Sequence, residues 1–359
     1  MAIQIAPAAA QKRLLQALEW AFDPDREVPN HWIGVTERIG DSPSQTLVAG
    51  LGAALLARAT RDDVDPLSIK AGYSERSFSL RTLCHGVLVP ASKDPVRPFH
   101  LGARGREPLN NQPYFRYDHL DEVDRIHASA RPYFEDLKTA LRQLDALPID
   151  EALAALAAFL RVRNRVQQAF DYERRAALPD SKTAETVLAA IVGLIGDDTA
   201  DRPLRLQAIV GGLVSCLTDE VSTGAINDPS RHAPGDVHVP NQRSAWWAAE
   251  VRGKPVAQHE AIEFVRECSH AGIGSAWIVV ISEGHQPLNR TAISAVARQL
   301  QVFVAVIESL EELLASCLGD PSGPASEQLQ AIPGAVRSHL EAAGARTETL
   351  LRWRALLTG

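Results

Sequence analysis

The sequence predicts an α/β (α+β) protein with a mixed central sheet in its C-terminal half and a largely helical N-terminal region. The first observation is a series of segments after residue 235 that follow the order β-β-α-β-α-β. The second is a pair of continuous apolar segments, AWIVVI and VFVAVI, which are typical of central strands covered on both faces. The third is the Ala- and Leu-rich helical periodicity of the chain before residue 180.

Helical periodicity accounts for most of the N-terminal region. The segments that show it are residues 10–22, 42–60, 118–175, 182–196 and 203–219. Residues 84–117 interrupt the pattern, because a Pro/Gly/Asn-rich stretch that cannot be regular helix follows an apolar VLV run. We therefore expect a helical region over residues 1–180 that contains a polar loop at about residues 72–117.

The remaining elements follow one another at short intervals. Two β segments, residues 235–239 and 246–254, flank a polar, turn-prone stretch and predict a hairpin. The segments after them are a helix at 258–270, a strand at 276–282, a helix at 290–299, a strand at 302–307 and a helix at 310–318. These elements define a core over residues 181–320, which is followed by a mostly helical tail over residues 321–359 that packs on the core or on a second subunit.

Two acidic residues occupy the predicted hairpin. Pairing of its strands brings Asp236 alongside Glu250. Alternate side chains of a strand share one face, so Glu250, Arg252 and Lys254 line up if residues 246–254 are extended. Neighbouring carboxylates repel each other unless a cation neutralises them, and Mg²⁺ prefers oxygen ligands. The pattern predicts a metal site beside a cation that binds phosphate. A metal-dependent nuclease uses side chains of these kinds. A structural ion pair with Arg252 or Lys254 is the alternative interpretation.

This block resembles the PD-(D/E)XK nuclease core, in which an Asp and a Glu bind magnesium and a nearby Lys assists the attacking water. Asp236 and Glu250 match the two acids. The Lys of that family lies two residues after the Glu, where this chain has Arg252, and Lys254 lies one strand step further on. An Arg stays protonated and cannot act as a base, whereas the pKa of a Lys can be tuned. Either cation remains a candidate for this position.

Longer segments are similar to the SacI-type type II restriction endonucleases. They are SERSFSL at 74–80, LGARGREPLNNQP at 101–113, NDPS at 227–230, GDVHV at 235–239 and EVRGKP at 250–255. The similarity covers roughly residues 30–310, and GREPLNNQP is more specific than any Asp/Glu spacing. The resemblance implies a magnesium-dependent homodimer that cuts both strands of DNA within a short palindrome.

Several side chains near these segments are candidates for DNA recognition, because Arg binds guanine or phosphate and Asn or Gln pairs with adenine edges. They are Arg76, Arg104, Arg106, Asn110, Asn111 and Gln112, which makes the loop at about residues 72–117 the expected DNA-recognition loop. For the GREPLNNQP segment, an ordered loop that hydrogen-bonds to itself explains the residues equally well. Glu220, at the end of a helical stretch, is a candidate third metal ligand, and a surface Glu is at least as good an interpretation.

Composition limits the classes of function. A chain of 359 residues with 45% hydrophobic residues can bury a large core. The net charge of −7 is unlike that of a general nucleic-acid binder, so DNA binding requires cations gathered in one cleft. No apolar segment reaches membrane-spanning length and no signal peptide is evident, which predicts a cytoplasmic protein. Four scattered cysteines predict reduced, mostly buried thiols.

Two other functions fit the same residues. A catalytically decayed PD-(D/E)XK protein that only binds DNA is consistent with the Arg at the usual Lys position. A repair-type nuclease of the same fold would cut without a fixed palindrome. A Rossmann-type enzyme is disfavoured, because no GxGxxG motif follows a predicted strand.

Overall fold

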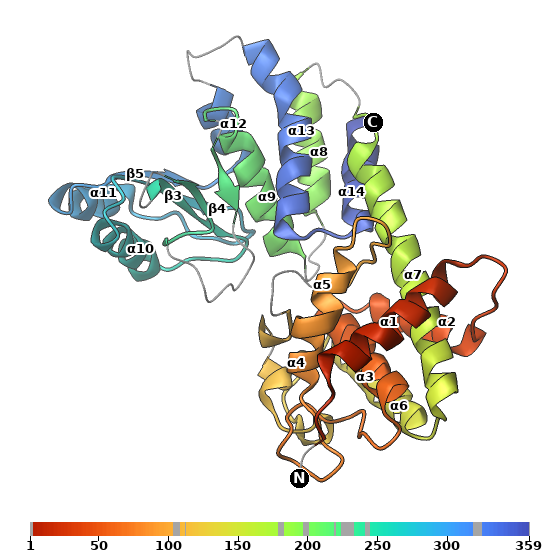
Figure 1. Ribbon diagram of the computed structural model, residues 1–359. Helices are drawn as coiled ribbons and strands as arrows, with labels where there is room; N and C mark the ends of the chain where they lie inside the picture. The colour runs from red at the N-terminus through yellow and green to blue at the C-terminus, as the bar shows by residue number, and fades with distance from the viewer. Residues whose placement is uncertain are drawn as a thin grey trace. The chain divides into compact units, whose positions relative to one another are not determined.

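The computed structural model forms two compact units, Met1–Asp171 and Tyr172–Gly359 (Figure 1). The described residues are 3–102, 108–111, 113–178, 183–196, 201–218, 220–223, 233–240, 245–318 and 325–358. Residues 321–359, which the sequence sets apart as a tail, belong to the second unit together with the sheet.

The first unit is built from helices around an apolar core. Its helices are α1 (Pro7–Phe22), α2 (Asn30–Gly40), α3 (Thr46–Thr60), α4 (Leu80–Leu83), α5 (Val89–Ser92), α6 (Arg131–Asp145) and α7 (Ile149–Arg175), the last of which continues into the second unit. The short turns are the π-helical η1 (Cys84–Leu88) and the 3-10 helices η2 (Pro108–Asn111), η3 (Pro113–Arg116) and η4 (Leu120–Glu122). Every residue of α3 from Thr46 to Ala59 is buried, as expected for a helix that is apolar on all sides.

The structure corrects the expectation for the start of residues 84–117, whereas the described residues from 93 to 117 contain no α-helix, as predicted. Residues 80–92 form one continuous helical segment in which α4 passes through the π turn of η1 into α5. The backbone N–H of Val89 donates to the carbonyl oxygen of Cys84, five residues earlier. Pro90 explains this widening, because proline has no N–H and its ring crowds the carbonyl four residues before it, that of Gly86. The predicted return to helix begins at Arg131 and not at residue 118.

In its described residues, the second unit contains a mixed sheet of five strands in the order β1-β2-β3-β4-β5. The strands are β1 (Ser222–Thr223), β2 (Val237–Pro240), β3 (Ala245–Arg252), β4 (Ser275–Val280) and β5 (Phe303–Ile307). The first three pair antiparallel, and β3, β4 and β5 pair parallel. The mixed sheet predicted from the sequence is therefore confirmed.

Helices connect and cover these strands. They are α8 (Ala184–Ile195), α9 (Arg202–Val214), α10 (Gln258–His270), α11 (Arg290–Gln299), α12 (Leu310–Leu318), α13 (Ala325–Ala343) and α14 (Thr347–Thr358). The crossover helices α10 and α11 pack on one face of the sheet through an apolar cluster that includes Phe264, Ile278 and Ile293 (Figure 1). Helix α9 contacts β2 and β3.

Helix α13 packs closely along α9. A Cβ added to Gly212 would lie 2.6 Å from the backbone nitrogen of Val336, so only glycine permits this approach. The C-terminal tail packs on the core, as one of the two predicted alternatives has it, through the contact of α13 with α9. All four cysteines are free, and three of them are buried. Among the described residues, no helix combines the length and apolar character needed to span a bilayer.

A buried histidine joins three elements of the second unit and predicts a pH-dependent stability. His339 of α13 is hydrogen-bonded through Nε2 to the hydroxyl of Ser215 (2.8 Å) and through Nδ1 to that of Thr223 (3.2 Å). Burial lowers its pKa below the ordinary value of 6.5. The unfolded chain therefore binds this proton more readily, so the contribution is full above about pH 6.5 and is lost as the pH falls towards the folded-state pKa.

We expect the urea midpoint of the wild-type protein to fall more steeply between pH 7 and pH 5 than that of His339→Gln, which has no titrating ring. Circular dichroism at a series of pH values measures both midpoints. Equal slopes for the two proteins would show that His339 titrates alike in the folded and unfolded states.

Candidate active site

The β2–β3 hairpin brings Asp236 and Glu250 together. Val237 pairs with Ala249, and the backbone N–H of Asp236, just before β2, donates to the carbonyl oxygen of the same Ala249. The carboxylates of Asp236 and Glu250 both contact the guanidinium of Arg252. The two acids that the sequence predicts to converge are therefore neighbours in the structure.

Backbone geometry fixes the position of Asp236. Its N–H donates to the carbonyl oxygen of Ala249 at 2.7 Å, and its Oδ2 accepts a hydrogen bond from the N–H of Val251 at 3.0 Å. The preceding Gly235 has a φ of +89°, and a Cβ there would lie 2.8 Å from the oxygen of Ala249. Glycine is required at this position, because an L side chain would strain the backbone and collide with the neighbouring strand.

Arg252 lies beside both carboxylates. Its Nη1 is 3.8 Å from Oδ2 of Asp236, and its Nη2 forms an ion pair with Oε1 of Glu250. The Asp236 and Glu250 side chains are only 14% and 18% exposed, so their mutual repulsion is weakly screened by water. The guanidinium offsets that repulsion. The Arg252 side chain is itself 43% exposed to solvent.

Helix α10 covers the face of the sheet that carries Glu250. Ala248, two residues before Glu250 on β3, and Ile278, its partner on β4, belong to the apolar cluster that includes Phe264 of α10. The pKa of the buried Cys268 thiol on α10 is raised to about 12, mainly by burial and in smaller part by the charges of Glu267 and Glu250. The pKa of Glu260 is lowered, first because its carboxylate accepts the backbone N–H of Ala257, with smaller effects of the nearby cations.

Two polar side chains of α9 support the site, and neither was predicted. Gln207, which is 2% exposed, donates from Nε2 to the carbonyl oxygen of Asp236 at 2.8 Å. Arg202 donates to the carbonyl oxygen of Gly253 at 2.5 Å and to that of Ile281 at 3.4 Å, which connects the ends of β3 and β4. Both contacts join residues far apart in the chain, and no local sequence pattern identifies them.

The structure does not place Lys254 and Glu220 as predicted. Strand β3 ends at Arg252, and Gly253 and Lys254 form a bend, so Lys254 does not continue the face that carries Glu250. Glu220 is exposed and precedes β1. Because Ser222 pairs with His238, the register directs Glu220 towards the end of β2 opposite to Asp236. It does not join the two carboxylates.

The predicted DNA-contacting residues have different outcomes. Arg76 forms an ion pair with Asp145 and donates to the carbonyl oxygen of Val64 at 3.0 Å, so its guanidinium is engaged within the first unit. Asn110 lies in η2 and is partly buried. Asn111 belongs to the same 3-10 turn. Three of the predicted residues lie outside the described part of the chain: Arg104, Arg106 and Gln112.

The donor set at the hairpin suits magnesium. Mg²⁺ usually keeps several water ligands and is held by one or two carboxylates, and Asp236 with Glu250 provides two. Among the described residues, no group of three or more His, Cys, Asp or Glu side chains is arranged to hold a metal. A closed zinc site of Cys and His ligands is therefore not present in that part of the chain.

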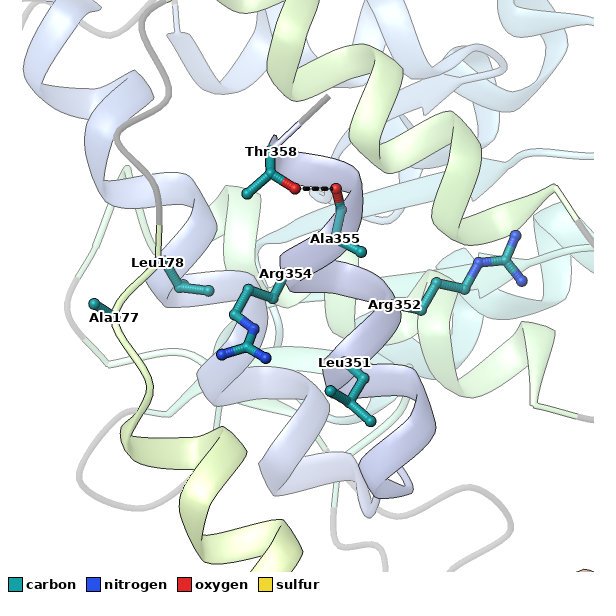
Figure 2. A pocket seen from close by; sticks show the side chains of 7 residues that line it. All are labelled: Ala177, Leu178, Leu351, Arg352, Arg354, Ala355 and Thr358. Carbon is teal, nitrogen blue, oxygen red and sulfur yellow. Dashed lines mark hydrogen bonds between the residues drawn. The ribbon is translucent and has the colours of Figure 1, made fainter.

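A separate cavity of about 770 Å³ in the second unit lies between residues 177–178 and α14 (Figure 2). Its two cations have structural partners: Arg352 donates to the carbonyl oxygen of Gly193 at 2.6 Å, and Arg354 donates to Glu173 at 3.2 Å. Its described lining contains no carboxylate and no cysteine, so it does not share the chemistry of the hairpin site.

The match to a known family model includes two of the segments singled out in the sequence, residues 74–80 and 101–113. Residues 9–164 match the family model described as the SacI restriction endonuclease N-terminal domain. The chain is also 36% identical to the type II restriction enzyme SacI of Streptomyces achromogenes, over an alignment that covers 98% of each chain.

Gly235 provides a test of the hairpin geometry. We expect Gly235→Ala to lower the free energy of unfolding by about 1–3 kcal/mol, because a left-handed φ and a backbone collision coincide there. Gly274→Ala is the matched control, since a Cβ at Gly274 meets nothing within 4 Å. Urea denaturation measures both variants, and equal stability of the two would contradict the backbone geometry described for Gly235.

Proposed function

Because the chain belongs to the SacI family of type II restriction endonucleases, we propose that it hydrolyses phosphodiester bonds of double-stranded DNA at a short palindromic site. The observation that carries this proposal is the convergence of Asp236 and Glu250 beside Arg252 on one face of the sheet. Paired carboxylates next to a cation are the side chains that metal-assisted phosphodiester hydrolysis requires.

The sheet itself supports assignment to the PD-(D/E)XK fold. An antiparallel hairpin carries the two acids, and its second strand continues into parallel strands that are connected by the crossover helices α10 and α11. This arrangement places Glu250 on a strand with a neighbour on each side. Glu250 is therefore held within the sheet, and Asp236, which directly precedes β2, is tied to β3 by its hydrogen bonds with Ala249 and Val251.

Asp236 and Glu250 are the residues that would hold magnesium. The bound ion would supply positive charge at the phosphate and lower the pKa of a coordinated water. The hydrogen bond from the N–H of Val251 orients the carboxylate of Asp236, and Gln207 holds the backbone of the same residue. These contacts preorganise Asp236, so little rearrangement of this residue would be needed when substrate binds.

Arg252 is our candidate for the position that a Lys occupies in related nucleases. It lies on the strand beside both acids, whereas Lys254 is exposed beyond the end of β3. A guanidinium stays protonated, so its role would be to bind a phosphate oxygen and stabilise the charge that develops during in-line attack. General-base chemistry is not available to it.

Cleavage of both strands within a palindrome has a consequence for assembly. The two scissile phosphates of such a site are related by a two-fold axis, so two identical active sites in a C2 dimer would match them. We therefore propose a homodimer as the form that binds DNA. Its recognition of a palindrome would follow from the symmetry of the protein.

Asp236→Asn and Glu250→Gln test the metal ligands. Both replacements keep the size of the side chain and remove its charge, so we expect magnesium-dependent cleavage of plasmid DNA to fall by at least about 100-fold. Binding to duplex DNA in calcium should persist. Glu220→Gln is the matched control, because Glu220 is exposed and points away from the pair.

Three outcomes of this experiment decide between the candidate functions. Discrete plasmid fragments with uniform ends support the restriction enzyme, and scattered ends support a repair-type nuclease. A wild-type protein that binds DNA without cutting it would establish the decayed, DNA-binding alternative, which is favoured only by the ion pairing of Arg252 with the acids.

Arg252→Ala and Lys254→Ala separate the two cations. We expect the first to reduce cleavage by about 100-fold, because it removes the charge next to the phosphate, and the second to change it by less than about threefold. Initial rates of plasmid cleavage in magnesium measure the difference. A larger loss in the Lys254 variant would assign the cationic role to the residue beyond the strand.

A further inference from the structure

A hollow with a partly polar lining lies in the first unit, along the helical segment 80–92. It has a volume of about 690 Å³, and its polar lining is formed by Arg81, Thr82, His85, Lys93 and Asn110. All but Asn110 come from one helical face or from the residue just after the helix, because positions 82, 85, 86, 89 and 93 follow helical spacing. Asn110 belongs to the GREPLNNQP segment.

The lining has the charge of an anion-binding site. Arg81 and Lys93 provide two positive charges, His85 an imidazole, Thr82 a hydroxyl and Asn110 a side-chain amide. No carboxylate occurs among the described residues that line the hollow. The whole protein has a net charge of −7, whereas the lining of this hollow has an excess of positive charge. The electrostatic field of the lining is what a phosphate at the hollow would experience.

Two features prepare the hollow before any ligand arrives. Arg81 donates from Nη2 to the carbonyl oxygen of Phe115, which is fully buried, so its guanidinium is anchored to the core. Gly86 leaves open space at the centre of the helical face, because a Cβ there would meet nothing within 4 Å. The π turn that contains Gly86 is a type of irregularity that occurs frequently at functional sites.

We infer that this hollow binds a backbone phosphate of the DNA substrate, an inference that rests on the proposed nuclease function. Arg81, Lys93 and the surrounding donors would grip the phosphate without reading sequence, since phosphate contacts fix position and base contacts specify. The first unit then contributes directly to DNA affinity, at a site that shares no residue with the carboxylate pair.

The test measures binding to duplex DNA in calcium at several salt concentrations. We expect Lys93→Gln to weaken binding about three- to tenfold. A plot of the logarithm of the affinity against the logarithm of the salt concentration should also become less steep, by about 0.9 for each hollow that contacts a phosphate. Gly86→Glu, which introduces a negative charge into the open space, should weaken binding by more than about tenfold. The matched controls are Gly86→Ala and Lys12→Gln, a substitution on the exposed surface of α1.

Failure of this inference is distinguishable from failure of the nuclease proposal. If the wild-type protein cleaves plasmid DNA while both Lys93→Gln and Gly86→Glu bind with unchanged slope, the phosphate site is wrong and the nuclease remains. A loss confined to one DNA sequence would overturn the phosphate assignment in favour of base contact. A wild-type protein that neither binds nor cleaves DNA would overturn both proposals. Thermal unfolding midpoints verify that each variant is folded.

Discussion

Pairing of β2 with β3 is the constraint on which the candidate active site depends. Two carboxylates that are 14% and 18% exposed repel each other, so nothing in the acids themselves would bring them together. The backbone ladder does so, with the hydrogen bond between Asp236 and Ala249 at its end and the close approach that Gly235 allows. The sheet hydrogen bonds and the apolar cover of α10 thus oppose the electrostatic cost of the site.

The elements that the sequence predicted well are those with one strong local signal. Helices 258–270, 290–299 and 310–318 have the predicted bounds, because clear apolar periodicity ends at turn residues on both sides. The predicted hairpin is present and brings Asp236 and Glu250 to the same guanidinium, because strand alternation and a polar turn agree. In these segments local preference and tertiary structure favour the same conformation.

The predictions that differ from the structure involve contacts that a local pattern does not encode. Strand β3 ends at Arg252, where Arg202 of a distant helix binds the next carbonyl, so Lys254 leaves the predicted face. Helix 80–92 was obscured by Pro90, whose effect is absorbed by a π turn and does not end the helix. Gln207 reaches Asp236 across 29 residues of sequence, and no spacing rule identifies such a pair.

Arginine at position 252 changes the physics of this site relative to a lysine. Its planar fork reaches both carboxylates at once, whereas an ammonium is a compact point charge. The acids are therefore partly neutralised by the guanidinium. Under the proposed function, the carboxylates would hold magnesium, and the half-exposed Arg252 would bind a phosphate oxygen of the substrate. The same cation would offset the repulsion of the acids in the folded protein and stabilise the charged transition state, two roles that depend on a permanent positive charge and not on proton transfer.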